Sequence, residues 1–297
     1  MKNSLEPEIR QNGHTITPPL NIQRIIEDAF IFLEEKASHF IKDIPENQSF
    51  IAHPDDPAEH KPKWHQFGII THTRKFADQY ERVLHHYIKE WGVEKVVNDY
   101  LNTTIDGISK KDLLRMSIPF HDVGKFAGRF FEMENGKSSA HFNGHEALSE
   151  TLIRENENIQ HFFISHGLSD LQIDYIARCA GLHYELGKIK KTLKYKGVDF
   201  TIAFTKSQDC EDYCLASMEE HPDFKVEMGV LFLCDSLAKT DIILDVRSDK
   251  EIAAKSDEVA QMVADQGLHP KLADAIKQLP VNIAFARTYL GLIPEQL

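Results

Sequence analysis

Hydrophobic and polar residues alternate along most of the chain with the period of about 3.6 residues that is typical of an amphipathic helix. Apolar residues recur at every third or fourth position from Ile22 to Leu33, which predicts a first helix. A long periodic stretch follows over 65–91, and another helix is predicted over 226–244. The pattern therefore indicates a mainly α-helical protein.

Short polar signals mark the expected ends of several helices. Ser109-Lys-Lys-Asp112 has the spacing of a capping box, and Gly124 is the expected end of the helix that begins there. Asn143 and Asp170 are side chains of the type that cap a helix N-terminus, and we expect each to open a further helix.

The segment 188–205 departs from the helical period. Within it, Thr192 to Phe204 alternates around Lys196-Gly197, which predicts a β-hairpin insert. We predict three parts. Residues 1–63 form an N-terminal extension that consists of a helix and a surface loop (44–63). Residues 64–245 form a helical domain, and residues 246–297 form a C-terminal extension. Helix signals at 250–266, 271–278 and 282–290 form this last part, which we expect to pack on the core.

Several predicted helices carry a metal-ligating side chain where the periodicity requires an apolar one. His72, for example, shares a face with Ile69 and Phe76. One such histidine would be an ordinary core residue bonded to a backbone carbonyl. Several such histidines, together with buried carboxylates that need partners, favour an arrangement in which these side chains converge on a metal ion. The inward residues are His72, His121 with Asp122, His145, His183 and Asp235.

Composition and charge narrow the classes of function. The 297 residues include 34 Lys and Arg against 46 Asp and Glu, a formal net charge of −12, which argues against an extended nucleic-acid or anionic-membrane surface. No apolar run approaches the roughly 20 residues of a membrane span, and the first ten residues lack the apolar segment of a secretory signal. The 4 cysteines do not suggest a disulfide framework, so we expect reduced thiols and a cytoplasmic protein.

The motif His121-Asp122-Val123-Gly124-Lys125 resembles the signature of the HD-domain superfamily, which is named for its His-Asp doublet. That family has an upstream histidine, the doublet, often two further histidines, and a downstream aspartate. The pattern maps in order onto His72, His121-Asp122, His145, His183 and Asp235. The resemblance implies an HD-type helical bundle with extra terminal helices. It also implies one or two divalent metal ions of the group Mn, Fe, Ni, Co, Mg and Zn.

Within the superfamily, the chain is most similar to the HD region of bacterial CCA-adding tRNA nucleotidyltransferases. Residues 120–153 and the element from Trp64-His65 to His72-Thr73 carry this likeness, which covers 64–245, about 60% of the chain. The 63 residues before it are too few for a polymerase head. We therefore expect a free-standing hydrolase-type domain.

The ligand set suggests how metal ions would be shared. His72, His121, Asp122 and Asp235 would form one site, and His145 and His183 a second site that Asp122 bridges. Two metal ions about 3.5–4 Å apart suit hydrolysis of a phosphoester by a metal-activated water. The expected function is that of a metal-dependent phosphohydrolase acting on a phosphomonoester or phosphodiester, such as a nucleotide. The resemblance to the nucleotidyltransferases alone adds 2′,3′-cyclic nucleotides to the expected substrates.

Other side chains near the motif are expected to contact the substrate. Asp122 and Lys125 are the expected catalytic residues. The expected substrate-binding residues are Lys125, Arg129 and His141. For Lys125 and Arg129 the alternative is an ordinary charged side chain on the solvated surface. The lysines of the predicted hairpin would either attract an anionic substrate or protect a sheet edge. They are Lys188, Lys190, Lys191, Lys194 and Lys196. The expected partner is a small phosphorylated, nucleotide-like molecule.

Two other functions fit the same ligands. Some HD proteins are di-iron oxygenases, and a non-catalytic nucleotide-binding regulatory module is the third hypothesis. His65 is expected to lie behind the ligands. The remaining histidines are expected on the surface or in the ordinary core: His53, His60, His85, His86, His161, His166, His221 and His269.

Overall fold

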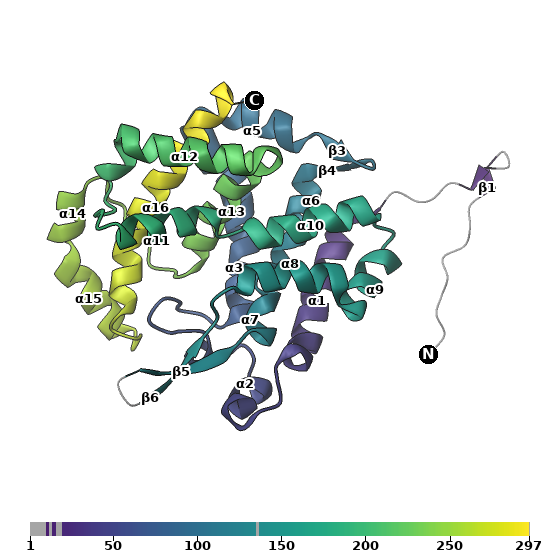
Figure 1. The fold of residues 1–297 in the computed structure, drawn as a ribbon, viewed down its shortest axis with the longest axis horizontal. Helices are drawn as coiled ribbons and strands as arrows, with labels where there is room; N and C mark the ends of the chain where they lie inside the picture. Colours follow the sequence, from purple (N-terminus) through teal and green to yellow (C-terminus); the bar gives the residue numbers. More distant parts are fainter. Residues whose placement is uncertain (1–9, 12–13, 16–19, 135–136, 297) are drawn as a thin grey trace.

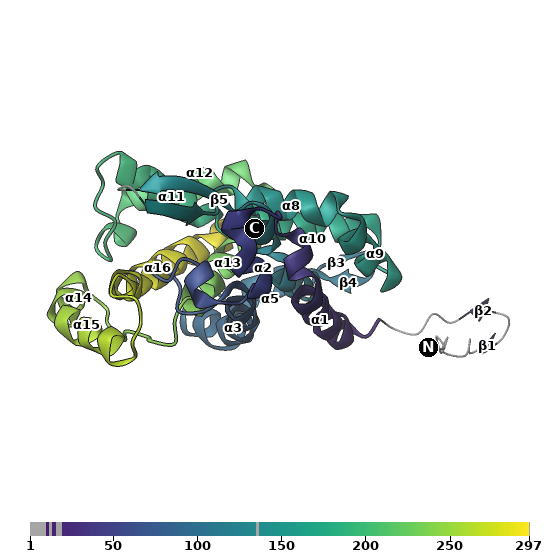
Figure 2. The same cartoon turned by 90° about the horizontal axis from the view of Figure 1, so that it is seen from below.

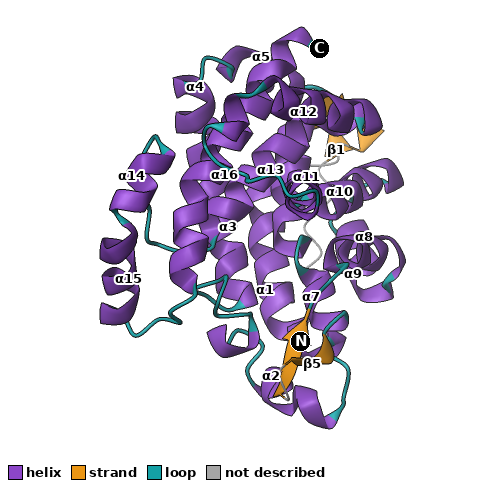
Figure 3. Cartoon of the chain, turned by 60° about the vertical axis from the view of Figure 1, so that its left-hand side comes forward, coloured by secondary structure: helices purple, strands orange, loops and turns teal. Residues whose placement is uncertain are grey.

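The first amphipathic stripe forms helix α1 (Ile22–Phe40), which Asn21 caps by accepting a hydrogen bond from the backbone N–H of Arg24. The computed structural model describes residues 10–11, 14–15, 20–134 and 137–296. Helices dominate this part of the chain (Figures 1 and 3), so the prediction of a mainly α-helical fold is confirmed. Residues 1–9, 12–13 and 16–19 of the predicted N-terminal extension lie outside the described residues.

The helices follow one another with short connections. The first half contains α2 (Gln48–Ala52), α3 (Ile69–Arg82), α4 (Ile88–Glu90), α5 (Glu94–Leu101), α6 (Lys110–Ser117), α7 (Val123–Ala127), α8 (His145–Glu155) and α9 (Glu157–Ser165). The second half contains α10 (Asp170–Leu182), α11 (Glu185–Tyr195), α12 (Gln208–Glu220), α13 (Lys225–Ala238), α14 (Asp249–Ala254), α15 (Ser256–Asp265) and α16 (Leu272–Leu292).

Three short antiparallel pairs contain all the strands among the described residues. They are β1 (Arg10–Gln11) with β2 (His14–Thr15), β3 (Thr104–Ile105) with β4 (Ile108–Ser109), and β5 (Phe130–Glu134) with β6 (Lys137–His141). The last pair is the longest and aligns Phe130 with His141. It follows α7 and projects at the bottom of Figure 1.

Helix α13 lies in the middle of the bundle. Every residue from Val226 to Ala238 is buried, as expected for a helix that neighbours cover on all sides. Helices α3, α10, α11 and α16 contact it, and α8 packs against both α7 and α10. This arrangement directs the centre of α3, the start of α8 and the end of α10 toward the same part of the core.

The β-hairpin prediction over 188–205 is wrong, because most of its first half is helix α11. Leu186 and Leu193 are buried on one face of this helix. Gly197, at a positive φ of 78°, ends it, since its N–H donates to the Lys194 carbonyl and the Val198 N–H donates to the Leu193 carbonyl. These are the two hydrogen bonds of a glycine-terminated helix, so Gly197 serves as a helix stop and not as a hairpin turn.

Helix boundaries also differ from prediction around residue 120. Ser109 does cap α6, because its Oγ accepts from the Asp112 N–H at 3.1 Å. The helix ends at Ser117, before a short 3-10 turn that contains Pro119, and Gly124 lies inside the next helix instead of ending the first. Proline has no N–H to continue the helical hydrogen bonds, which explains the break.

Two predicted caps move by one residue. The residue before α8 is Gly144, at a φ of 78°, and not Asn143. Ser169, and not Asp170, caps α10, and the Gln172 side chain completes a capping box. Both predictions found the correct helix and missed the residue that ends the preceding loop.

The described parts of the two terminal extensions differ from the prediction in their helices and in the burial of the expected loop. The expected loop over 44–63 contains α2 and buries Phe50 and His60. The separate helices expected over 271–278 and 282–290 are one helix, α16, with Pro280 buried inside it. The predicted helix over 250–266 is divided into α14 and α15, which lie together at one end of the molecule in Figure 2. A small separate hydrophobic cluster, which includes Val259, joins α15 to α16.

Among the described residues, no helix combines the length and the hydropathy that a membrane crossing requires.

Gly124 allows α7 and α8 to approach closely. A Cβ atom at this position would lie 2.2 Å from the His145 carbonyl oxygen and 2.7 Å from the Ser149 nitrogen. We predict that Gly124→Ala lowers the free energy of unfolding by about 1–3 kcal/mol, because backbone must move to relieve the contact. Urea denaturation followed by circular dichroism measures this loss.

The matched control is Gly291→Ala, also in a helix, where a Cβ atom would meet nothing within 4 Å. This change should be neutral or stabilise the protein by up to about 1 kcal/mol through helix propensity. Equal effects at the two glycines would contradict the close approach of α7 and α8.

Candidate metal centre

Six side chains predicted as metal ligands come from separate elements and meet in the core. They are His72 in the middle of α3, His121 and Asp122 between the 3-10 turn and α7, His145 at the first position of α8, His183 just after α10, and Asp235 on α13. All except His145 are almost completely buried. The structure therefore brings together the whole predicted set.

The four histidines share one orientation. In each case Nδ1 contacts a backbone carbonyl oxygen, at Ala238 (3.2 Å) for His72, Ile118 (2.8 Å) for His121, Phe142 (2.9 Å) for His145 and Ala180 (2.7 Å) for His183. Because a neutral imidazole that donates from Nδ1 has its lone pair on Nε2, all four rings can present Nε2 as a ligand.

Asp122 lies between two pairs of these imidazoles. Its Oδ2 is 3.2 Å from His121 Nε2 and 3.7 Å from His72 Nε2. Its Oδ1 is 3.1 Å from His145 Nε2 and 3.7 Å from His183 Nε2. The residues form two groups of three, His72, His121 and Asp122, and Asp122, His145 and His183. Within each group, the ligand atoms lie within 4.8 Å of one another. One carboxylate thus joins two sets of metal-ligating atoms.

Buried polar atoms of the cluster that make no hydrogen bond include His121 Nε2 and Asp122 Oδ1. Such atoms are rare in protein cores, and here each is a good ligand of a divalent transition metal. Asp235 borders the first group, with its Oδ1 3.2 Å from His72 Nε2. The cluster has the composition and geometry to hold a metal ion.

The charges of the cluster favour ligation. Burial raises the pKa of Asp122, but His121 and Lys125 more than offset it and hold this pKa well below its usual value. The pKa of Asp235 is likewise low because Lys239 and His72 outweigh burial. Burial lowers the pKa of His72, and it lowers that of His183 to about 3. Ionised carboxylates and neutral imidazoles are the protonation states that bind metals.

Lys125 lies against the cluster. Its Nζ is 2.6 Å from Asp122 Oδ2 and 3.0 Å from His60 Nε2, and its side chain is buried. The sequence suggested that Lys125 reaches a substrate phosphate, and the structure places its charge directly beside the bridging carboxylate. The role toward phosphate stays a prediction.

Sequence reasoning missed two groups at this site. His60 is buried, stacks on His65 with ring centroids 4.0 Å apart, and contacts Lys125. It comes from a proline-rich segment without a helical period, which gave no signal. Lys239 Nζ lies 2.9 Å from Asp235 Oδ2, and the spacing of four residues on one helix face was a signal for this pair. The expected place of His65 behind the ligands agrees with its ring contact to His72.

Two predicted substrate-binding residues lie at the base of the β5–β6 hairpin: Arg129 directly precedes β5, and His141 is the last residue of β6. Arg129 is ion-paired with Glu59 and packs against the rings of Phe50 and Phe131. His141 stacks on Phe130 with ring centroids 5.6 Å apart. Arg129 thus has a carboxylate partner that its sequence context did not predict, and binding of substrate by either residue stays a prediction.

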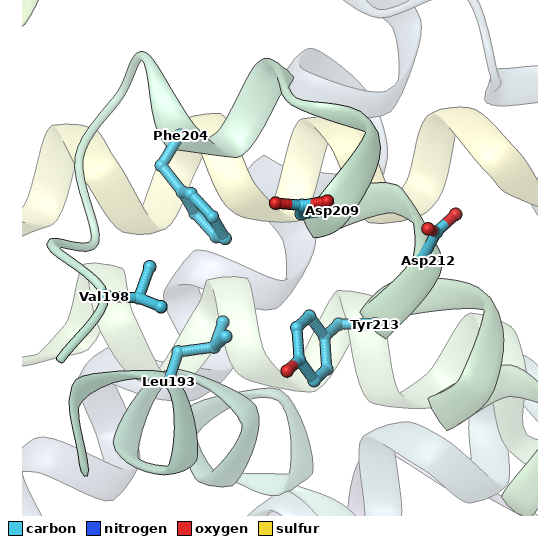
Figure 4. Close-up of a pocket in the computed structure, with 6 residues that line it drawn as sticks. All are labelled: Leu193, Val198, Phe204, Asp209, Asp212 and Tyr213. Atoms are coloured by element: carbon cyan, nitrogen blue, oxygen red, sulfur yellow. The ribbon is translucent and has the colours of Figure 1, made fainter. Parts of the chain in front are cut away.

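A surface pocket of about 220 Å³ lies between α11 and α12 (Figure 4). Its lining residues are Leu193, Val198, Phe204, Asp209, Asp212 and Tyr213, none of which belongs to the His/Asp cluster. The two carboxylates at its edge disfavour an anionic ligand.

No protein-family model, no curated protein and no solved structure matches the chain. The geometry and charges of the cluster are therefore the basis for assigning a function.

The buried imidazoles make the metal-free protein sensitive to acid. Burial lowers the pKa of His60, His65, His72 and His183, whereas in the unfolded chain each histidine takes up a proton near its ordinary value of about 6.5. The unfolded state therefore binds more protons below that pH, and stability is lost as the pH falls. We predict that in EDTA the free energy of unfolding drops from pH 7 to pH 5, by up to about 1.4 kcal/mol per pH unit for each histidine.

Urea denaturation at a series of pH values measures this slope. His60→Gln should reduce the slope by up to about 1.4 kcal/mol per pH unit, because one histidine fewer takes up a proton on unfolding. His85→Gln replaces an exposed side chain and should leave the slope unchanged. A free energy of unfolding that is constant from pH 7 to pH 5 would contradict neutral, buried imidazoles.

Proposed function

We propose that this protein is a metal-dependent phosphohydrolase of the HD type. The observation that carries the proposal is the position of Asp122, which offers one carboxylate oxygen to His72 and His121 and the other to His145 and His183. A carboxylate shared between two groups of imidazoles suits a pair of divalent ions, and such pairs catalyse phosphoester hydrolysis in many enzymes.

The six proposed ligands would form two metal sites. His72, His121, Asp122 and Asp235 would hold one ion, and Asp122, His145 and His183 a second. Bound there, a divalent cation supplies Lewis acidity and lowers the pKa of a coordinated water to near 7. The Nδ1 hydrogen bonds to backbone carbonyls fix the orientation of each ring, so the ligands need little rearrangement.

The buried Lys125 and the partly buried Lys239 support an anionic substrate. Lys125 and Lys239 place ammonium groups within 3 Å of Asp122 and Asp235, at 2.6 and 2.9 Å. They balance the two carboxylates, so the positive charge of divalent ions would leave the site strongly attractive to a phosphate group. Lys125 is in place to hold a phosphate oxygen beside the ligands.

This charge pattern also favours hydrolysis of phosphate over the two other hypotheses. A di-iron oxygenase would use the same ligands but has no need of two ammonium groups beside them. A regulatory module has no need of the full set of six ligands. We propose a small phosphorylated, nucleotide-like substrate and no extended nucleic acid.

The assay is phosphate release after anaerobic reconstitution with Mn(II) or Fe(II). The substrate panel contains phosphomonoesters, nucleotides and 2′,3′-cyclic nucleotides, with a phosphatase coupled to the last group to liberate phosphate. We predict that Asp122→Asn lowers kcat/KM by at least about 10³-fold, because both ligand groups lose their shared carboxylate. The matched control, Asp241→Asn, removes an exposed carboxylate paired with Lys75 and should retain activity.

The result that contradicts the proposal is an equal background rate for the wild type and Asp122→Asn across the whole panel. Oxygen uptake by the Fe(II) form without phosphate release would instead identify the oxygenase.

A further inference from the structure

A group of lysines lies next to the candidate centre, at the junction of α11, α13 and α16. Lys190, Lys191 and Lys194 lie on α11, and Lys239 follows α13 directly. We call these four residues the lysine cluster. They come together in a chain with an excess of 12 acidic charges, so their association is not a consequence of overall composition.

Lys190 has no carboxylate partner in any ion pair of the described residues. Its Nζ donates instead to Asn282 Oδ1 at 2.7 Å and lies 5.5 Å from the centre of the Phe200 ring. Burial first, and then the neighbouring charges of Lys239 and Lys194, together lower the pKa of Lys190 to about 7. The ammonium groups therefore repel one another at a partly buried position.

The lysine cluster is continuous with the centre. Tyr184 directly follows His183, and the centre of its ring lies 5.0 Å from Lys191 Nζ and 5.1 Å from Lys239 Nζ. A Cβ atom on Gly187 would lie 2.2 Å from this ring, so the glycine leaves room for it. Lys239 in turn contacts Asp235. One end of the lysine cluster therefore borders the ligands.

Hydrogen bonds hold the other end in place. Asn282 accepts from Lys190 and donates from Nδ2 to Ser236 Oγ at 3.1 Å, and Ser236 is the neighbour of Asp235 on α13. Repulsion between positioned ammonium groups costs stability, and a phosphate group bound among them would remove that cost.

We propose that the lysine cluster binds a second phosphate group of the substrate, beyond the phosphate that is hydrolysed. The preferred substrate is then a nucleotide-like molecule with two phosphate groups. This inference rests on the proposed function for the identity of the reaction, and the anion site itself can be tested without it.

The first test measures binding of inorganic pyrophosphate to the metal-free protein in EDTA, by isothermal titration calorimetry. At pH 6, below the lowered pKa of Lys190, Lys190→Gln should weaken binding about fivefold, because a positive charge is lost while the amide can still bond to Asn282. The matched control is Lys188→Gln, on the same helix, where the lysine is exposed and paired with Glu185. It removes the same charge and should leave the affinity within twofold. Circular dichroism melting checks that both variants fold.

Equal affinities for the wild type, Lys190→Gln and Lys188→Gln would overturn the anion site, and so would the same loss in both variants. The second test compares kcat/KM for a nucleoside monophosphate and the bisphosphate of the same nucleoside. In Lys190→Gln, kcat/KM for the bisphosphate should fall about tenfold more than kcat/KM for the monophosphate.

The two proposals fail in different ways. Hydrolysis of both substrates with no effect of Lys190→Gln overturns this inference and leaves the proposed function intact. Pyrophosphate binding that depends on Lys190, with no hydrolysis of either substrate, overturns the proposed function and supports the anion site.

Discussion

The structure of the core depends on how the buried carboxylate of Asp122 is compensated. An isolated buried carboxylate is strongly unfavourable, and a fold that contains one must supply partners. Here Lys125 contacts one oxygen, and imidazoles from α3, α8 and the end of α10 surround both. Gly124 lets α8 approach closely enough for His145 to reach this carboxylate. Packing and candidate chemistry thus follow from the same constraint.

The centre was predictable from the sequence because its residues occupy inward positions of amphipathic helices. His72 and Asp235 interrupt apolar stripes, and the His121-Asp122 doublet follows one directly, so each demanded a polar partner. His60 was not predictable in this way, because a proline-rich segment has no period that distinguishes its inner from its outer face. The error at 188–205 has a local cause: Lys196-Gly197 reads equally as a hairpin turn or a helix stop, and only the hydrogen bonds of Gly197 distinguish them.

The lysines around the centre fall into two sets, one in contact with the carboxylates and one farther away. Lys125 and Lys239 each balance one carboxylate at close range. Farther from the ligands, the other residues of the lysine cluster are less completely paired. Lys190, for example, donates to the side-chain amide of Asn282 and not to a carboxylate that would neutralise its charge. The site therefore combines a balanced interior with an electropositive border, an arrangement that suits a ligand whose negative charge extends beyond the reacting group.

The most direct test of this account is the metal content of the protein after equilibrium dialysis against Mn(II) at neutral pH, determined by elemental analysis. The account predicts that the wild type retains at least one ion per chain and that Asp122→Asn retains none, since every proposed ligand group includes this carboxylate. Absence of bound metal in the wild type, or equal retention by Asp122→Asn, would contradict it.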